Sequence, residues 1–535
     1  MVKMLECTKR PDRFSKTCQV LNKVLTLILF STFLNCSQQK MYKPKTYFPS
    51  PQTWQDKTFY FAVTDRFIDG DSTNNNLSGN FDPKNPYKVH GGDFKGVTKA
   101  IPYLKSLGVD VLWLTPIQKQ AYGEYHGYAI SDFYSVNPTL GTFGEFRELV
   151  KTAHEYGIYV CLDVIVNHSG DLLNAKSGKW KWNPEGYELA YKDKKKKHFP
   201  KIFQNPELFH NYGNVADWND PKQVLYGEFP GGLDDFKTEN PIVREEMLKI
   251  WSWWIEHTDV DAFRIDTAKH VEISFWNDFI KGIKTKAKEL GKDNFWIFAE
   301  SYEFEDHKSQ RFLNPDSIGE NTFDSVLNYT LWGTQKEVFG KNGSVRKLAE
   351  IWEENKKSFG ETTCNKLMTF VENHDQPRLL SYQENANPNL LKLALVYNFT
   401  APGIPIVYYG AEIPFKGGND PENREDFFKT ENPLSTEKEN FKLISYLASI
   451  RKKFRGISEG SFEIYFVDDK SILFKRSFGP EKPIWVAINL SNEKVKLDLP
   501  KRGIYYQNTY NQIAMLLSSS VFVEPYGFEI LTQER

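Results

Sequence analysis

The sequence lacks an excess of charge of either sign. Its 68 Lys and Arg residues are balanced by 69 Asp and Glu residues, which gives a formal net charge of −1. Proteins that bind nucleic acid typically carry a strongly basic surface. The balanced charge therefore gives no indication of a nucleic-acid partner, and we expect none.

Cysteine is also scarce, with five residues among 535. If the N-terminal segment is removed as a signal, three remain, at positions 36, 161 and 364. Cys161 lies in an apolar, strand-like run, and no regular spacing links the three. The sequence therefore shows no evident disulfide framework.

The N-terminal apolar run is too short to cross a membrane. VLTLILFSTFL (24–34) has 11 residues, whereas a spanning helix needs about 20. It follows a basic region, as in a secretory signal, and Cys36 follows the run after one residue, Asn35, which resembles a bacterial lipoprotein signal. We expect an exported cell-envelope lipoprotein anchored at Cys36, with plain secretion or a retained signal anchor as alternatives.

Aromatic residues, by contrast, are abundant, with 13 Trp, 27 Tyr and 40 Phe. They could form a large aromatic core, or they could present flat rings that stack on sugars. Composition alone leaves both interpretations open.

Short apolar runs alternate with amphipathic, helix-like stretches along most of the chain. Such runs joined by helices indicate parallel strands that are covered on both faces. Eight runs predict a closed (β/α)₈ barrel; the alternative, a doubly wound open sheet, lacks the expected GxGxxG after its first strand. The runs cover residues 58–67, 109–116, 157–168, 260–266, 294–301, 323–329, 366–375 and 404–410.

Two segments interrupt or follow the barrel pattern. About 70 residues separate the third strand from the next helix, which is too long for a structureless loop and predicts an inserted subdomain. After the last barrel helix, alternating runs predict a C-terminal antiparallel β-sandwich. The expected organisation is signal peptide 1–35, tether 36–56, barrel 57–168, insertion 169–240, barrel 241–455 and C-terminal β domain 456–535.

Polar residues end several of the predicted strands. In DAFRIDTAKH (261–270), Arg264 and Asp266 share one face because side chains alternate along a strand. Any such pair could be a structural ion pair, but barrels of this kind place catalysis at the C-terminal strand ends. The residues that we expect to converge there are Asn167, His168, Arg264, Asp266, Glu300, His374 and Asp375.

These motifs resemble those of the α-amylase family of retaining glycoside hydrolases. DVIVNH (163–168), DAFRIDTAKH, FAES (298–301) and ENHDQPR (372–378) are similar to the motifs at strands three, four, five and seven. Segments near residues 125–142, 232–241 and 403–412 also resemble family segments, in the family's order.

The resemblance implies three catalytic carboxylates. Asp266 corresponds to the nucleophile, Glu300 to the general acid/base and Asp375 to the carboxylate that holds sugar hydroxyls. Retaining hydrolysis needs one ionised carboxylate that attacks and one protonated carboxyl that releases the leaving oxygen, about 5–5.5 Å apart. We expect Arg264 to keep Asp266 ionised through a low pKa, and the apolar residues before Glu300 to favour its protonated form.

The resemblance also implies sugar contacts. Histidines would donate to hydroxyls at the cleavage point, a tyrosine would stack on that sugar, and other residues would bind the leaving side or distal sugars. Asp420 and Arg424 could equally form a local loop ion pair. The implied substrate-binding residues are Tyr128, His168, Arg264, Lys269, His270, His374, Asp420 and Arg424.

A structural calcium ion is implied as well. Asn167 and Asp235 match the side-chain ligands of the family, and the carbonyl of His270 would complete the site. Oxygen ligands suit this hard cation, which would hold the insertion on the barrel.

The sequence thus predicts an α-glucan hydrolase that uses two carboxylates and calcium support, expected as a monomer. A 4-α-glucanotransferase or an oligoglucosidase with the same residues remains an alternative. A non-catalytic glycan-binding protein is disfavoured because all three carboxylates are present.

Overall fold

The computed structural model describes residues 46–500, 504–508, 514–517 and 519–534. The predicted signal peptide, its Cys36 and most of the predicted tether lie outside the described residues. From Phe48 onward the chain forms one compact unit. Within the described part, no helix combines the length and apolar character needed to cross a membrane.

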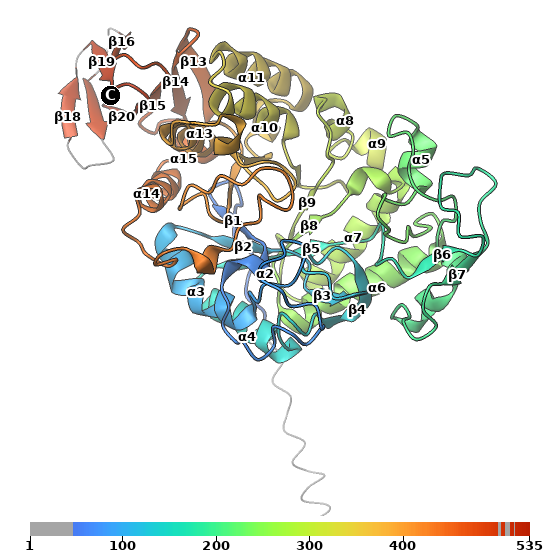
Figure 1. Ribbon diagram of the computed structural model, residues 1–535. Helices are drawn as coiled ribbons and strands as arrows, with labels where there is room; N and C mark the ends of the chain where they lie inside the picture. Colours follow the sequence, from blue (N-terminus) through green and yellow to red (C-terminus); the bar gives the residue numbers. More distant parts are fainter. Residues whose placement is uncertain (1–45, 501–503, 509–513, 518, 535) are drawn as a thin grey trace, which may run out of the picture. The chain divides into compact units, whose positions relative to one another are not determined.

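Eight parallel strands form the central sheet (Figure 1), in the order β10-β9-β8-β5-β2-β1-β12-β11. A parallel bridge between Leu327 and Met368 joins the two ends of this order, so the sheet closes into a barrel. The predicted (β/α)₈ fold is confirmed. The strands are β1 (Phe59–Ala62), β2 (Val111–Leu114), β5 (Tyr159–Val164), β8 (Ala262–Ile265), β9 (Trp296–Ala299), β10 (Ser325–Val326), β11 (Met368–Phe370) and β12 (Ile404–Tyr408).

Helices follow the strands and carry apolar faces toward the sheet. The larger ones are α3 (Phe94–Leu107), α4 (Phe143–Glu155), α6 (Pro241–Thr258), α7 (Ile273–Glu289), α10 (Tyr329–Gln335), α11 (Arg346–Phe359), α13 (Asn389–Thr400) and α14 (Glu439–Lys453). Local sequence sets their starts. Thr142 and Glu145 form a capping box at α4, and Asn240 caps α6 with Pro241 in the first helical position.

Strand β8 shows the alternation expected from its sequence. Phe263 points to the helix layer, where its ring centroid lies 6.1 Å from that of Trp251 in α6. Arg264 points the other way and contacts Asp163 of β5. Because the C-terminal end of β8 opens at the rim of the barrel, Asp266 emerges directly beside this arginine.

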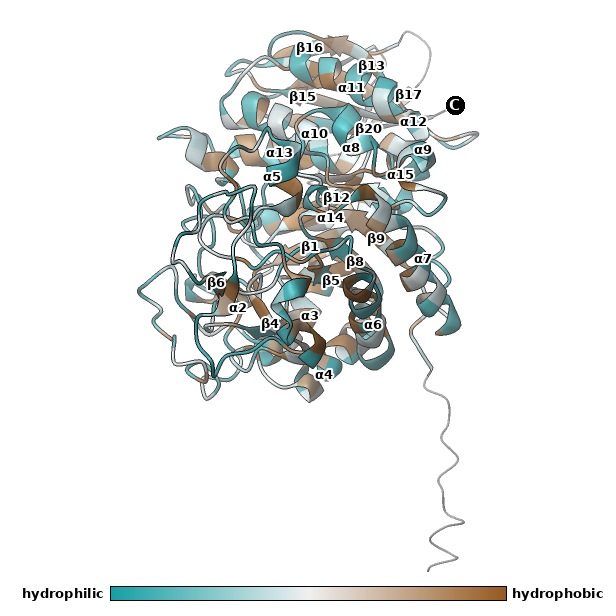
Figure 2. Cartoon of the chain, turned by 90° about the vertical axis from the view of Figure 1, so that its right-hand side faces the viewer, coloured by the Kyte–Doolittle hydropathy of each residue, from teal (hydrophilic) through white to brown (hydrophobic). Residues whose placement is uncertain are grey.

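Two segments inserted after β2 and after β5 extend the C-terminal rim of the barrel. A hairpin of β3 (Gln118–Gln120) and β4 (Ile130–Val136), which the sequence did not reveal, follows β2. The segment after β5 contains β6 (Leu173–Ala175), β7 (Leu189–Tyr191) and the short helix α5 (Pro221–Tyr226). The loops around β6 are mostly hydrophilic (Figure 2).

The C-terminal part folds as an antiparallel β domain, as predicted. A six-stranded sheet has the order β13-β14-β15-β20-β17-β18, and β16 pairs with β19 in a second sheet. Leu473, Leu497 and Val521 belong to a separate apolar core between the two sheets. The strands are β13 (Ser461–Val467), β14 (Ser471–Ser477), β15 (Ile484–Asn489), β16 (Val495–Asp498), β17 (Ile504–Asn508), β18 (Ala514–Leu517), β19 (Ser520–Val523) and β20 (Phe528–Glu534).

The last residues of the segment predicted as a tether pack against the barrel. Trp54 is buried, its ring centroid lies 6.0 Å from that of Trp296, and its Nε1 donates to the Asn294 carbonyl at 2.8 Å. This indole covers the end of the barrel opposite the catalytic rim.

Candidate active site

The C-terminal ends of the barrel strands surround a cavity of about 600 Å³. Predicted site residues form most of its wall: Tyr128, His168, Asp266, Lys269, His270, Glu300, His374 and Asp375. The remaining lining residues, which we did not predict, are Trp218, Phe229, Leu233, Thr267 and Tyr302. The structure therefore brings together residues that lie up to about 250 positions apart in the chain.

Arg264, buried inside the barrel, holds three carboxylates together. Its Nη1 lies 2.7 Å from both Asp163 Oδ1 and Asp266 Oδ1, and its Nη2 lies 2.9 Å from Glu300 Oε2. The backbone N–H of Thr267 donates to the same Glu300 oxygen at 3.0 Å. One guanidinium thus fixes both predicted catalytic carboxyls relative to each other.

The protonation of this cluster differs from the expectation. Burial raises the pKa of Asp266 well above its ordinary value; the charge of Arg264 opposes this shift, and the Glu300 and Asp163 carboxylates add to it. Burial also raises the pKa of Asp163, to about 6. The prediction of a low pKa for Asp266 is therefore wrong, because three buried carboxylates share one positive charge. Burial of three carboxylates around one positive charge thus favours the protonated form of the group as a whole.

Two neutral histidines flank the carboxylates. Burial lowers the pKa of His168 to about 3 and that of His374 well below its ordinary value. His168 Nε2 lies 3.9 Å from Asp266 Oδ2, and neither it nor His374 Nδ1 has a hydrogen-bond partner among the described residues. Both nitrogens are thus buried polar atoms whose hydrogen-bonding capacity no described residue uses. The third carboxylate, Asp375, lies 3.4 Å from His374 Nε2.

Tyr128 forms a flat wall beside these groups. Its ring stacks on that of His374, with centroids 5.3 Å apart and planes inclined by 14°. Its hydroxyl donates to Asp163 Oδ2 at 3.0 Å and lies 2.7 Å from His374 Nε2. These contacts fix the orientation of the ring at the wall of the cavity.

The residues predicted for the leaving side are anchored by backbone carbonyls. Lys269 Nζ donates to the Tyr302 carbonyl at 3.0 Å, and His270 Nδ1 lies 2.8 Å from the Val224 carbonyl of α5. The second contact joins the barrel to the insertion.

Asp420 and Arg424 do not line the cavity. They form an ion pair at 3.1 Å, as the alternative interpretation predicted. Arg424 also reaches toward the site, because its Nη2 lies 3.7 Å from Asp375 Oδ1.

Asp163 and Tyr329 also escaped the sequence analysis, as did the five lining residues named above. Asp163 stands inside the quoted motif DVIVNH, and Tyr329 ends the sixth apolar run, so their positions at strand ends were a usable signal. Trp218 and Phe229 come from the aromatic-rich insertion, with ring centroids 5.8 Å apart. Their place at the cavity depends on how the insertion folds, which local sequence does not indicate.

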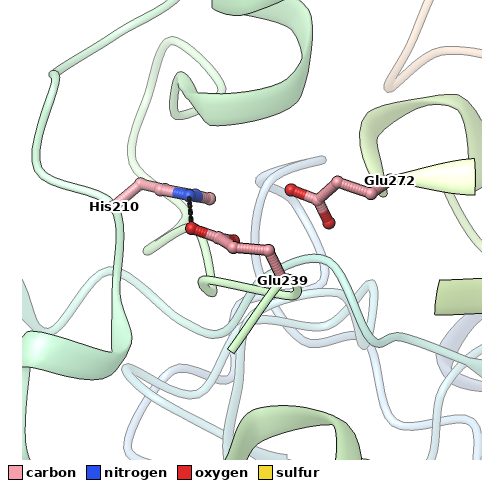
Figure 3. Close-up of side chains that lie close together, drawn as sticks. All are labelled: His210, Glu239 and Glu272. Carbon is pink, nitrogen blue, oxygen red and sulfur yellow. Dashed lines mark hydrogen bonds and ion pairs between the residues drawn. The ribbon is translucent and has the colours of Figure 1, made fainter. Parts of the chain in front are cut away.

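The predicted calcium ligands Asn167 and Asp235 lie side by side. Asn167 Nδ2 donates to Asp235 Oδ1 at 3.0 Å, while His210 Nδ1 lies 2.6 Å from Asp235 Oδ2. Although burial opposes it, hydrogen bonding to Asp235 and Glu239 raises the pKa of His210 to about 9. Figure 3 shows this imidazole directed at Glu239, with Glu272 nearby. Both carboxylate oxygens of Asp235 thus already have partners among the described residues, which leaves Asn167 and Asp235 few free oxygens for a cation.

A second oxygen-rich loop fits a hard cation better. In DGDSTNNN (69–76), the side-chain oxygens of Asn74 and Asn75 are buried without hydrogen-bond partners among the described residues. Asn75 Nδ2 donates to Asp69 at 2.9 Å, and Asn74 Nδ2 lies 3.5 Å from Asp93. Unsatisfied buried oxygens beside carboxylates are the donors that calcium prefers.

Comparisons with known proteins agree with this geometry. Residues 61–445 match the family model described as "Alpha amylase, catalytic domain". A β/α-amylase of Paenibacillus polymyxa is 31% identical over 459 residues, covering 83% of this chain and 34% of that protein. An α-amylase of Streptomyces lividans is 28% identical, covering 75% and 50%. The chain therefore spans only a third to a half of the length of these two relatives.

Solved structures show the same relationship over nearly the whole fold. An Anoxybacillus α-amylase superposes with a TM-score of 0.77 at 30% identity, covering 90% of this chain and 99% of that one. A cyclomaltodextrin glucanotransferase, CldA, gives 0.76 at 29% identity with the same coverage. Together with the family match, they show that this chain belongs to the α-amylase family of glycoside hydrolases and transferases.

Proposed function

We propose that the protein is a retaining hydrolase that cleaves α-1,4-glucosidic bonds of starch, glycogen or maltooligosaccharides. The observation that carries this proposal is the contact of Arg264 with both Asp266 and Glu300 in a cavity that also exposes Asp375. The similarity to a Geobacillus α-amylase whose structure was solved in complex with acarbose supports it, at 30% identity and a TM-score of 0.73.

In the proposed reaction, a carboxylate oxygen of Asp266 attacks the anomeric carbon while Glu300 gives its proton to the leaving glucosidic oxygen. The C–O bond to the leaving sugar breaks as the bond to Asp266 forms. A water molecule then gives a proton to Glu300 and displaces Asp266, which restores both carboxyls. The neutral His168 and His374 donate hydrogen bonds to hydroxyls of the sugar, and Tyr128 stacks on it.

A 4-α-glucanotransferase is the second candidate. Trp218 and Phe229 favour it, because aromatic rings beside the leaving-side residue His270 can retain a sugar acceptor. The likeness to CldA and to a Klebsiella oxytoca cyclomaltodextrin glucanotransferase, at 29% identity, is compatible with this activity.

A product time course on starch and maltoheptaose separates these candidates. Short maltooligosaccharides from the wild type, with none from Asp266→Asn or Glu300→Gln, support a hydrolase that acts through both carboxyls. Products longer than maltoheptaose indicate a transferase. Binding to starch without turnover by the wild type would leave only a glycan-binding protein.

We also propose calcium as a structural ion and export as a lipoprotein. The oxygen-rich loop at Asn74 and Asn75 supports the ion, which would stiffen the segment between β1 and α3. The signal-like N-terminus supports a lipid anchor at Cys36, a position outside the described residues. Loss of radiolabelled palmitate incorporation in Cys36→Ala tests the anchor.

A further inference from the structure

We propose that Tyr329 is a positioning residue that confines the catalytic proton of Glu300 to one carboxyl oxygen, Oε1, and directs it toward the cavity. This inference rests on the proposed function, because it concerns how the general acid of that reaction is held. It adds a residue that neither the sequence motifs nor the comparisons single out.

One oxygen of Glu300 is closed to the proton. Oε2 lies 2.9 Å from Arg264 Nη2 and accepts a hydrogen bond from the Thr267 N–H at 3.0 Å. Both neighbours are obligatory donors. A proton on Oε2 would point an O–H group at two N–H groups, so the acidic proton must reside on Oε1.

The other oxygen has a single hydrogen-bond partner among the described residues. The Tyr329 hydroxyl donates to Oε1 at 3.1 Å, and it accepts from Asn373 Nδ2 at 3.3 Å. The amide therefore turns the phenol proton toward Glu300. With one direction at Oε1 taken by Tyr329, the carboxyl proton is left to face the cavity, which Glu300 lines.

Burial and aromatic packing fix the position of the Tyr329 ring. It is the first residue of α10, two residues separate it from the short strand β10, and only 1% of it is exposed. Its ring centroid lies 5.0 Å from that of Tyr302 and 5.2 Å from that of Phe370. Burial, followed by the charges of Glu300 and Asp375, raises its pKa well above the ordinary value, so it remains a donor.

Several other charged or titratable groups face Glu300 and share control of its proton. They come from β5, the end of β8, the loop after β9 and the end of β11: Asp163, Arg264, Asp266, Lys269, His270, Tyr302 and His374. Asp375 lines the same cavity as Glu300. Tyr329 differs from them because, among the described residues, it alone hydrogen-bonds the oxygen that carries the proton. Its hydrogen bond strengthens as that proton leaves, which stabilises the charge that develops on Glu300.

The test compares Tyr329→Phe with the wild type on two substrates. In maltoheptaose the leaving group is a sugar oxygen, which must be protonated to a hydroxyl group as it departs. In 2-chloro-4-nitrophenyl α-maltotrioside the leaving group is a stable phenolate, which hardly needs a proton. We expect kcat/KM to fall about tenfold or more on maltoheptaose, the effect of one hydrogen bond to a developing charge, and about twofold or less on the aryl substrate. The alkaline limb of the pH profile should move to higher pH, since the ionised form of Glu300 loses a donor.

Tyr60→Phe is the matched control. The Tyr60 hydroxyl donates to the buried Glu412 at 2.6 Å, outside the cavity, so the variant removes an equivalent bond without touching the site. It should leave both kcat/KM values and the pH profile unchanged. Equal losses on the two substrates in Tyr329→Phe, with an unmoved alkaline limb, would overturn the inference and leave Tyr329 a packing residue.

A second measurement guards against misfolding of the phenylalanine variant. Replacement of Tyr329 by 3-fluorotyrosine keeps the shape and makes the phenol a stronger donor, so the alkaline limb should move to lower pH. An unmoved limb contradicts the inference. Failure of the proposed function is seen separately, because Glu300→Gln would then retain activity on maltoheptaose whatever Tyr329 does.

Discussion

Arg264 donates to Asp163 at 2.7 Å, the distance at which it also contacts Asp266. The pairing follows from the register of the sheet, in which Asp163 of β5 lies directly opposite Arg264 of β8. The arginine is therefore shared between a residue that supports the site and the residues proposed to carry out the chemistry. This arrangement leads to the first prediction.

Replacement of Asp163 by Asn should lower kcat/KM on maltoheptaose by roughly tenfold and move the alkaline limb of the pH profile to lower pH. With one negative charge removed, the remaining carboxyls ionise more readily, so the cluster loses its proton at lower pH. Steady-state kinetics between pH 4 and 9 measure this effect. An alkaline limb that moved upward, or stayed in place, would show that Asp163 does not share the proton.

Tyr128 should contribute mainly through its ring. Tyr128→Ala removes the stacking surface and should raise KM for maltoheptaose by about tenfold, the effect of one sugar–aromatic contact. Tyr128→Phe keeps the ring but loses the hydroxyl bonds to Asp163 and His374, so KM should change less than kcat. The opposite order, with Phe worse than Ala in KM, would mean that the ring does not bind sugar.

Phe229 should influence the balance of transfer and hydrolysis. It lines the cavity, with its ring centroid 4.8 Å from that of His270. In Phe229→Ala an acceptor sugar loses a stacking partner, whereas water loses nothing. The ratio of elongated to shortened products from maltoheptaose should therefore fall severalfold, by roughly 1 kcal/mol of acceptor binding. An unchanged ratio would place the acceptor elsewhere.

Calcium should stabilise the protein through the loop at Asn74 and Asn75. At about 100 times its dissociation constant, an ion that binds only the folded state adds about 2.7 kcal/mol. We expect EDTA to lower the melting temperature of the wild type and added calcium to restore it. Asn75→Ala should lose this response, whereas the exposed neighbour Asn76→Ala should keep it. Loss of the response in Asp235→Asn alone would move the ion to the site predicted from the sequence.

Arg476 should stabilise the contact between the C-terminal β domain and the barrel. It is buried and donates to the Thr400 carbonyl at 3.0 Å and to Asn365 Oδ1 at 2.8 Å. Arg476→Met leaves these acceptors unpaired and should lower the free energy of unfolding by about 3 kcal/mol. The exposed Arg455→Met, which loses an ion pair with Glu459 on α15 (Arg455–Glu459) and a cation–π contact with Phe478, should cost under about 1 kcal/mol. Urea unfolding followed by tryptophan fluorescence measures both, and equal costs would contradict this role.

The barrel and its catalytic rim could be anticipated because their signals are local. A strand that is buried on both faces has a continuous apolar sequence. Because successive side chains of a strand point to opposite faces, Arg264 and Asp266 lie on the same face of β8 whatever the position of β8 in the sheet. The same applies to the capping box at Thr142, which marks the start of α4 within four residues of sequence. Once the apolar runs are assigned to parallel strands, the polar residues at their C-terminal ends must lie together at one end of the barrel, which identifies the catalytic rim.

Other features depend on contacts between distant segments, which no local pattern encodes. The pairing of Asp163 with Arg264 requires the register of β5 against β8, and the bond from Tyr329 to Glu300 requires closure of the barrel through β10. The pKa of Asp266 is raised and not lowered as expected, because three carboxylates are buried around one arginine. Each of these carboxylates can be recognised in the sequence, but their common burial cannot. Residue types and strand periodicity thus specified which groups are available, whereas strand register, barrel closure and shared burial specified which groups meet around Arg264.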